Sequence, residues 1–344
     1  CIRDRTQAPR RSSDPRGAFS IPSLFHFALG KGKLTPTMTS NPITLSTPTN
    51  TSAYRAAFSD HQLLAAPSEP HHRIIRATVC DVSTPTENLK RIVIHSPELV
   101  GFQLSGPDEF FGLFMPAKPG EDLHLPLHGG GANIRASVAA MPETQRPNLR
   151  WYTVRSLDPE CGQITFDVAT HGVKNPKDEH VGPGLAWALA TRVGDQVGIW
   201  TCQGLWHRAQ SSQTLIADPS AVPSVRAILD YADAFAPEQL RDMHLVVVAE
   251  NHGDLEPSLV ADWESKLGSL EVLFSATTDF SAAVIAHLQQ LDSAEHPATQ
   301  SQYVWVSGEG QLCKDVRHHA IHTWGLNSES VQWCPYWFLG RARP

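Results

Sequence analysis

The sequence predicts an N-terminal antiparallel β-barrel domain followed by a C-terminal α/β domain with a parallel sheet. Residues 72–208 hold several short strand-like runs between Gly and Pro turn signals, with one short helix-forming run. From about residue 212, apolar strand-like runs alternate with helical periodicity, which is typical of a parallel sheet covered on both faces. The expected parts are a disordered or upstream tail (1–70), the barrel (71–208) and the α/β domain (209–344).

Composition excludes several classes of protein. The 344 residues carry a formal net charge of -7, so a nucleic-acid partner is not expected. No apolar run reaches the length of a membrane span, and a cytoplasmic monomer is predicted. The cysteines stand singly without a C-x-x-C pair, which disfavours a zinc ribbon or an iron–sulfur cluster and favours reduced thiols.

The first 70 residues do not read as a folded domain. Residues 1–37 are rich in Ser, Pro and Arg, and the first methionine is Met38, so we expect the natural start near Met38. Residues 20–29 are apolar, but Pro22 and His26 interrupt them and no clean cleavage pattern follows. Residues 39–70 are rich in Ser, Thr, Pro and Asn and are predicted to be disordered.

The elements of the barrel follow from alternation and turn signals. Residues 158–162 read as a hairpin turn, 128–148 as a loop, and 185–190 as a short helix after two glycines. The Gly triplet 129–131 is a poor phosphate loop because no helical pattern follows it. Strands are expected at 72–82, 89–95, within 114–127 after a turn, at 150–155, 163–170 and 196–201.

The α/β half alternates strands and helices. In the helix 223–235, Val225, Ile228, Leu229 and Ala232 fall on one face. Strands are expected at 213–218, 244–250, 270–275, 303–309 and 331–337, and further helices at 259–267, 282–291 and 312–324.

The stretch 150–155 concentrates chemistry on one strand. Alternation would point Arg150, Tyr152 and Val154 one way and Trp151, Thr153 and Arg155 the other. A guanidinium, an aromatic plane and a hydroxyl close together are what a flavin dinucleotide requires. An ordinary amphipathic strand with two exposed arginines is an equally good interpretation of this stretch alone.

Two strand ends and one turn in this chain are candidate binding positions. Open α/β sheets bind ligands at the carboxyl ends of their strands, where Asp218 and Ser220 follow one strand and Gly308 and Glu309 end another. Ser220 and free backbone N–H groups at a helix start suit phosphate, and the second end suits nicotinamide or ribose. Capped strand-to-helix turns are the alternative at both ends. The turn 182–184 before a helix is a further candidate anion site, or simply a tight turn.

Metal and nucleophile chemistry have little support. His318 and His322 are spaced i, i+4 on one helix, but no third ligand is evident, so no metal site is expected. No G-x-S-x-G motif occurs.

Seven short motifs occur in one order between residues 150 and 341. This ordered set resembles the siderophore-interacting protein family, the FAD-dependent ferric-siderophore reductases of the ferredoxin-reductase-like superfamily, and the resemblance covers about residues 72–341. The motifs are Arg150-x-Tyr152-Thr153-x-Arg155, His171-Gly172, Gly182-Pro183-x-x-x-Trp187-Ala188, Gly194-Asp195, Ala217-Asp218-x-Ser220-Ala221-x-Pro223, Trp305-x-x-Gly308-Glu309 and Tyr336-Trp337-x-x-Gly340-Arg341.

The resemblance implies residue roles. Tyr152 would stack on the flavin, Thr153 would reach its N5 atom, and Arg150 would meet the pyrophosphate. Nicotinamide would lie near Ser220 and Gly308. The remaining implied cofactor residues are Val154, Arg155, Asp167, Val168, Ala169, His171, Gly182, Gly184, Trp187, Ala188, Asp218, Ala221, Glu309 and Trp337.

Two stretches depart from the family's pattern. Residues 173–181 are longer than the family's usual spacing, and Phe338 stands where a basic residue usually follows the Tyr-Trp pair. Arg341 is the expected substrate contact, with Arg343 close by in the sequence.

The implied activity is reduction of a ferric siderophore. Hydride would pass from NADH or NADPH to FAD, and single electrons would then pass to Fe(III), releasing Fe(II) for iron acquisition. A flavin oxidoreductase with another acceptor, or a non-catalytic siderophore- or flavin-binding module, is the alternative. Ferredoxin is a possible alternative donor. No Arg or Lys occurs in 251–254, after the second α/β strand, so NADPH is not favoured there.

Overall fold

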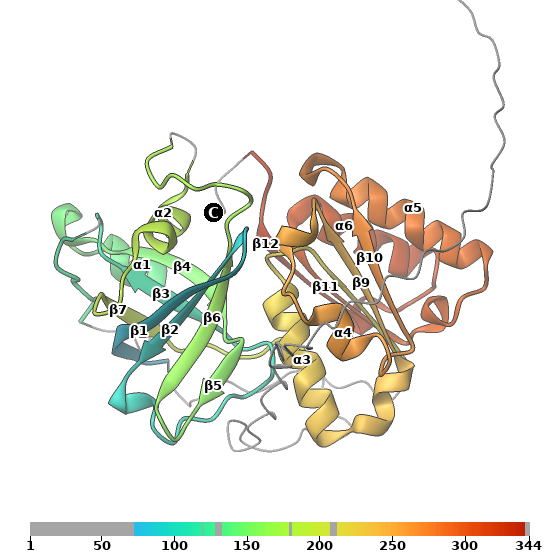
Figure 1. Cartoon of the computed structure of the whole chain (residues 1–344), viewed down its shortest axis with the longest axis horizontal. Helices are drawn as coiled ribbons and strands as arrows, with labels where there is room; N and C mark the ends of the chain where they lie inside the picture. The colour runs from blue at the N-terminus through green and yellow to red at the C-terminus, as the bar shows by residue number, and fades with distance from the viewer. Residues whose placement is uncertain (1–71, 119, 128–132, 179–180, 207–211, 341–344) are drawn as a thin grey trace, which may run out of the picture. The chain divides into compact units, whose positions relative to one another are not determined.

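Two β-sheets organise the chain in the computed structural model, which describes residues 72–118, 120–127, 133–178, 181–206 and 212–340 (Figure 1). All of these residues belong to one unit of the fold. The tail predicted over residues 1–70 lies outside the described part.

The first sheet has seven strands in the order β4-β3-β7-β1-β2-β6-β5, and all neighbouring strands are antiparallel. The sheet curls so that the chain leaving β4 meets β6. The N–H of Arg155, two residues after the end of β4, donates to the Thr165 carbonyl of β6 at 2.9 Å. The predicted antiparallel barrel is therefore confirmed as a curled half-barrel. Its strands are β1 (Ile74–Thr86), β2 (Leu89–His95), β3 (Phe110–Met115), β4 (Asn148–Thr153), β5 (Ser156–Asp158), β6 (Gln163–Ala169) and β7 (Gln196–Trp200).

Period-two alternation explains this curled sheet. On β2, Ile92 and Ile94 are fully buried, and their partners on β6 are Phe166 and Ile164. These side chains join one apolar core with residues of β1, β3 and β7. Burying one face of each strand fixes the register, since a slip of one residue would expose the apolar set.

The sequence interpretation fails between residues 110 and 140. The strand expected within 114–127 is wrong: β3 ends at Met115, and no strand follows in the described residues up to 127. Pro116 and Pro126 each lack a backbone N–H and so cannot donate to a ladder. Part of the expected loop 128–148 is helix α1 (Ile134–Ala139), whereas the Gly triplet lies outside the described residues.

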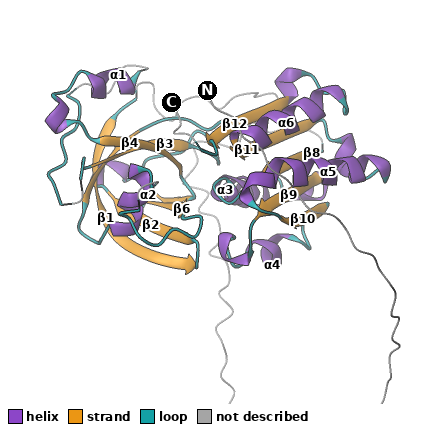
Figure 2. Cartoon of the chain, turned by 90° about the horizontal axis from the view of Figure 1, so that it is seen from above, coloured by secondary structure: helices purple, strands orange, loops and turns teal. Residues whose placement is uncertain are grey.

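The second sheet is parallel, in the order β10-β9-β8-β11-β12, and confirms the predicted α/β domain. Helices α3 and α4 bury their apolar side chains against one face, and α5 and α6 against the other (Figure 2). The strands are β8 (Gln213–Ala217), β9 (Met243–Ala249), β10 (Ser269–Phe274), β11 (Tyr303–Glu309) and β12 (Val331–Trp337), and the helices α3 (Val222–Phe235), α4 (Leu259–Trp263), α5 (Phe280–Ser293) and α6 (Gly310–His322).

The strand order places a topological switch point between β8 and β11. The chain runs outward from β8 to β9 and β10, then returns to β11 on the other side of β8. Ala217 at the end of β8 pairs with Ser307 of β11. Ligands of open α/β sheets bind in the crevice outside such a point.

Two further observations concern the described residues only. None of their helices has the length and apolar character that crossing a membrane requires. Their five cysteines, Cys80, Cys161, Cys202, Cys313 and Cys334, are free thiols.

Candidate functional site

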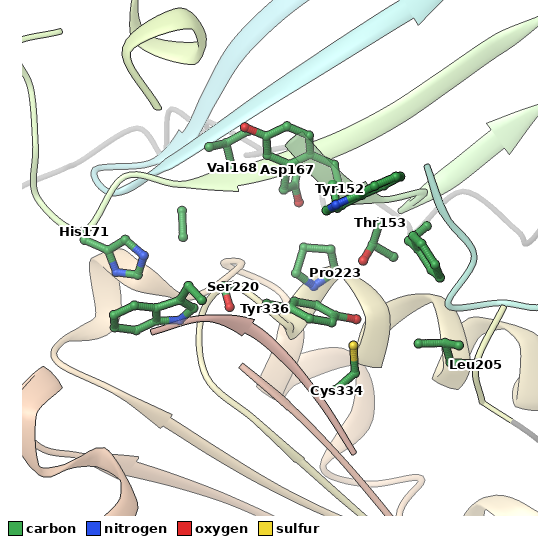
Figure 3. A pocket seen from close by; sticks show the side chains of 14 residues that line it. Tyr152, Thr153, Asp167, Val168, His171, Leu205, Ser220, Pro223, Cys334 and Tyr336 are labelled. Atoms are coloured by element: carbon green, nitrogen blue, oxygen red, sulfur yellow. The ribbon is translucent and has the colours of Figure 1, made fainter. Parts of the chain in front are cut away.

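A cavity of about 260 Å³ opens beside β4 and β6 of the first sheet and beside β12 and the end of β8 of the second (Figure 3). In Figure 3, Tyr152 and Val168 stand on one side of this space, and Ser220 and Tyr336 on the other. Its lining consists of Phe110, Trp151, Tyr152, Thr153, Asp167, Val168, Ala169, His171, Leu205, Ser220, Pro223, Cys334, Tyr336 and Trp337.

Tyr152 presents a neutral aromatic ring to the cavity. Its ring packs on Phe166 with centroids 5.1 Å apart, and burial raises the pKa of its phenol well above the usual value. Helix α2 (Pro183–Ala190) begins against it: a Cβ on Gly184 would lie 2.7 Å from the Tyr152 hydroxyl and 2.9 Å from Arg150 Cγ. Glycine is therefore required where α2 approaches β4.

Three hydroxyls form a connected group at one wall. Thr153 Oγ1 lies 2.8 Å from Ser224 Oγ, and Ser224 Oγ lies 2.8 Å from the Tyr336 hydroxyl. Ser224, in the first turn of α3, is fully buried, whereas Thr153 and Tyr336 reach the cavity. Burial raises the pKa of Tyr336 despite its contacts with Ser224 and Thr153, so the phenol keeps its proton.

Trp337 and His171 line another part of the cavity, with ring centroids 5.1 Å apart. The Trp337 indole N–H donates to Asp218 Oδ2 at 2.8 Å, which fixes the orientation of the ring. His171 has φ of 50° and Gly172 φ of 75°. A left-handed conformation is uncommon outside glycine, so the turn of the chain at His171 costs local backbone strain.

Asp218 is the centre of a buried hydrogen-bond group and does not itself line the cavity. Its carboxylate also accepts from the Ser220 N–H and hydroxyl and from the Glu309 N–H, at 2.6 to 2.9 Å. Burial raises the pKa of Asp218, although these donors act in the opposite direction. Gly308 is at φ 135°, and a Cβ there would lie 2.5 Å from the Asp218 carboxyl carbon.

At the end of β11 the structure contains the capped-turn arrangement, whereas the N-cap of α3, Ala221, has no side-chain cap. Glu309 caps α6 by accepting from the Gln311 and Leu312 N–H groups, and its other oxygen accepts from the Leu339 N–H. The free backbone N–H groups expected beside Ser220 are instead bonded: the Ser220 N–H donates to the Asp218 carboxylate, and the Ala221 and Val222 N–H groups donate to the Asp218 carbonyl. Of these two strand ends, the end of β8 reaches the cavity, through Ser220, and the end of β11 does not.

Arg155 is held in an ion-pair cluster with Arg91, Asp167 and Glu256. Arg155 pairs with Glu256 and lies 3.6 Å from Asp167, while Arg91 makes two bonds of 2.8 Å to Asp167 and one of 3.1 Å to Glu256. Burial alone would raise the pKa of Glu256, but the charges of Arg155, Arg226 and Arg91 bring it below its ordinary value. Arg155 thus serves this cluster. Val154 follows the end of β4 and is buried in the core, so the expected alternation stops at Thr153.

Arg150 and the start of α2 form a separate polar corner. The Arg150 side chain is exposed, and its guanidinium donates to the Leu149 carbonyl at 2.7 Å. Gly182 is the N-cap of α2 and supplies no side-chain cap. A cation beside an uncapped helix start suits a phosphate group. Trp187 and Ala188 of the same helix are core residues, and Ala221 is fully buried at the start of α3.

Several cavity residues were absent from the predicted site. Cys334 and Tyr336 lie two residues apart on β12, so their side chains point to the same face of the strand. If Tyr336 is assigned to the cavity, this spacing also indicates Cys334. Phe110 pairs with Thr153 across β3 and β4, but β3 was not predicted. Trp151 lies on the candidate flavin strand and Pro223 in a family motif without a predicted role, and nothing local in the sequence indicates Leu205.

The remaining sequence candidates fall elsewhere. Arg341 and Arg343 lie outside the described residues. Phe338 packs on the start of α6, where a Cβ on Gly310 would lie 2.2 Å from its ring. The rings of His318 and His322 are 4.3 Å apart, and within the described ranges no group of three His, Cys, Asp or Glu could hold a metal ion.

The donor set fits the ring system of a flavin. Aromatic side chains and the hydroxyls of Thr153, Ser220 and Tyr336 surround a space slightly below the roughly 300–1,000 Å³ of small-molecule pockets, enough for one planar ring system. The pyrophosphate of a dinucleotide would then require the corner at Arg150 and α2.

Comparison with sequence models of known families covers most of the chain. Residues 78–206 match the siderophore-interacting FAD-binding domain, and residues 210–340 match the siderophore-interacting protein family. The chain belongs to the siderophore-interacting protein family. The first domain is accordingly an FAD-binding domain, and the prediction of FAD is confirmed.

Solved structures of this family share the fold. The siderophore-interacting protein SipS from Aeromonas hydrophila is 22% identical, with a TM-score of 0.59 over 79% of this chain and 93% of that one. A siderophore utilization protein from T. fusca is 19% identical, with a TM-score of 0.60 over 81% and 97%. A ferredoxin-NADP+ reductase from Plasmodium falciparum, at 9% identity and TM-score 0.52 over 77% of this chain and 97% of that one, extends the likeness to the ferredoxin-reductase-like fold.

Curated relatives match over part of their length. The mycobactin import ATP-binding/permease protein IrtA of Mycolicibacterium smegmatis is 21% identical over 271 residues, 78% of this chain. The chain spans about a quarter of that protein, 26%. A ferric acinetobactin reductase from Acinetobacter baumannii is 32% identical over 99 residues, 28% of this chain and 32% of that protein.

Proposed function

We propose that this protein reduces ferric siderophores with electrons from NADH or NADPH, through FAD. The observation that carries the proposal is the cavity in which Tyr152 and Thr153 of the FAD-binding domain face Ser220 and Trp337 at the switch point of the α/β domain. FAD, when bound, would supply the redox chemistry of accepting a hydride and passing single electrons to Fe(III). Hard oxygen donors hold Fe(II) more weakly, so reduction would release the iron.

The residues of the first sheet would hold and orient the flavin. Tyr152 offers a neutral plane for stacking, and Thr153 offers a hydroxyl that can donate or accept. Arg150 and the start of α2 offer positive charge for the pyrophosphate. The Arg155 cluster would keep the end of β4 in place rather than bind phosphate.

The residues at the switch point would receive the nicotinamide. Ser220 and Trp337 reach the cavity, and Asp218 holds both side chains by hydrogen bonds of 2.6 and 2.8 Å. Asp218, Gly308 and Glu309 would therefore act as positioning groups. A monomeric state, a cytoplasmic location and the domain boundaries at 70 and 208 remain predictions from the sequence.

The iron substrate rests on family membership and on the relatives' names. The relatives include a ferric acinetobactin reductase and a mycobactin import protein, and both matching family models are described as siderophore-interacting. A different acceptor is the second candidate, favoured by one observation: Phe338 occupies the position where the family resemblance calls for a basic residue, and its ring packs on Gly310.

Replacement of the Tyr152 and Thr153 side chains tests the assignment of the flavin site. Tyr152→Ala combined with Thr153→Ala removes both the plane and the hydroxyl, so the purified protein should carry less FAD or be reduced more slowly. The paired control, Tyr152→Phe with Thr153→Ser, keeps a ring and a hydroxyl and should retain FAD. Wild-type flavin content and reduction rate in the alanine double variant would contradict this assignment.

A further inference from the structure

The hydroxyls of Thr153, Ser224 and Tyr336 form a hydrogen-bonded chain in which the direction of one bond affects the other. Both ends of the group, Thr153 and Tyr336, line the cavity, and its middle member, Ser224, is fully buried. Figure 3 shows Thr153 and Tyr336 projecting toward one another from separate segments. The members come from β4, α3 and β12, so the group joins the FAD-binding domain to the α/β domain.

The count of hydrogens allows two arrangements. Each hydroxyl has one hydrogen to donate and two lone pairs to accept. The two bonds of 2.8 Å use two of the three hydrogens, and at both bonds either oxygen can be the donor. If Tyr336 donates to Ser224 and Ser224 to Thr153, the Thr153 hydrogen is free for the cavity. If the direction reverses, Thr153 presents lone pairs to the cavity and Tyr336 holds the free hydrogen.

The chemistry of the ligand makes this reversal useful. A flavin ring nitrogen that carries no hydrogen in the oxidised form can accept a hydrogen bond. In the reduced form the same nitrogen carries a hydrogen and can donate one. A fixed donor would serve one form and oppose the other. The burial that keeps Tyr336 protonated preserves the hydrogen that Tyr336 donates to Ser224 in the first arrangement, without which only the reversed arrangement would be left.

We propose that Ser224 and Tyr336 are positioning residues that let Thr153 alternate between donating to the cavity and accepting from it as the bound FAD changes oxidation state. Each hydroxyl rotates about its C–O bond, and no bond to hydrogen breaks. This inference rests on the proposed flavin site, but it does not depend on the identity of the electron acceptor.

The test is the flavin reduction potential, measured on the FAD-loaded protein against a reference dye. When Thr153 accepts from the cavity, Tyr336→Phe leaves the buried Ser224 hydrogen without an acceptor, whereas in the other arrangement Ser224 still donates to Thr153 and loses only an accepted bond. A buried donor without an acceptor is the costlier loss, so the variant should disfavour the reduced flavin. At a fixed potential the ratio of reduced to oxidised flavin should fall about three- to tenfold, the range of one hydrogen bond. The matched control is Ser301→Ala, which removes another buried serine with a 2.8 Å bond to a threonine hydroxyl, that of Thr214; the ratio should stay at the wild-type value.

A double-mutant cycle with Ser224→Ala separates the relay from a direct effect of the phenol. If Tyr336 acts through Ser224 and not through its own contact with Thr153, the effect of Tyr336→Phe should shrink clearly in the Ser224→Ala background. An equal effect in both backgrounds, or a wild-type ratio in Tyr336→Phe, would overturn the inference. A wild-type protein that binds FAD but never passes electrons to a ferric siderophore would instead overturn the proposed function and leave the relay intact.

Discussion

Glu256 should stabilise the fold by holding two arginines of the FAD-binding domain, and Glu256→Gln tests this directly. The Glu256 side chain is 5% exposed and lies 3.1 Å from the Arg91 guanidinium, with Arg155 in closer contact. Glutamine keeps the size and shape of the side chain but removes its charge. Arg91 and Arg155 would then share Asp167 alone.

The magnitude follows from the geometry. One pair at 3.1 Å attracts with about 5 kcal/mol at an effective dielectric constant of about 20, most of which offsets desolvation. Removing one partner of a buried pair costs about 3–5 kcal/mol. Arg91 and Arg155 keep 22% and 14% exposure and retain Asp167, so we expect the lower end, about 3 kcal/mol. That corresponds to a fall in Tm of about 6–12 °C.

The effect should depend on pH in one direction. The pKa of Glu256 lies below its ordinary value of 4.5 in the folded protein, so its contribution is present above pH 4.5. It is lost as the pH falls through the folded pKa, because the unfolded chain binds the proton more readily. The difference in Tm between wild type and Glu256→Gln should therefore be full at pH 7 and shrink on acidification below 4.5.

Thermal unfolding followed by circular dichroism at pH 7 and at steps below pH 4.5 measures both effects. Glu238→Gln is the matched control, because Glu238 is exposed on the surface, and its Tm should stay within about 2 °C of wild type. The reasoning fails if Glu256→Gln melts with the wild type at pH 7. A difference that persists unchanged in acid would also refute it.

Two further predictions concern the switch point. Gly308→Ala should lower the free energy of unfolding in urea by about 1–3 kcal/mol, because φ is 135° there and the new Cβ would meet the Asp218 carboxylate. Gly101→Ala, at φ 74° with open space around it, should lower this free energy by less, and equal losses would contradict the clash. Glu250 follows β9 with its carboxylate bonded to the Thr277 N–H at 2.8 Å, where an acid suits a ribose 2′-hydroxyl and repels a 2′-phosphate. The wild type should prefer NADH, and Glu250→Gln should raise the kcat/KM ratio of NADPH to NADH about tenfold, or about 1.4 kcal/mol; an unchanged ratio would remove Glu250 from nucleotide selection.

Much of the fold was accessible from local patterns. The apolar runs of β9 and β11 and the facing residues of α3 are set by burial on two sheet faces, which period-two and period-3.6 patterns report directly. Phe110–Met115 is also an apolar run, but the prolines and glycine that follow indicate a turn, and reading residue 114 onward as turn then strand shifted the expected strand toward residue 127.

The candidate site was predictable where it lies on one strand and not where it depends on distant partners. Tyr152, Thr153 and His171 carry their signal in short motifs, and all three reach the cavity. Arg155 has the same motif context, yet its partner Glu256 lies 101 residues away in the sequence. No local pattern can reveal that such a cation is already neutralised.

Anaerobic absorbance spectroscopy of the FAD-loaded protein tests ferric-siderophore reduction most directly. Addition of NADH should bleach the oxidised flavin absorbance, and a ferric siderophore added afterwards should restore it while an Fe(II) chelator reports stoichiometric ferrous iron. If the flavin bleaches and the ferric siderophore neither restores its absorbance nor yields Fe(II), the protein is a reductase for a different acceptor and ferric-siderophore reduction is contradicted.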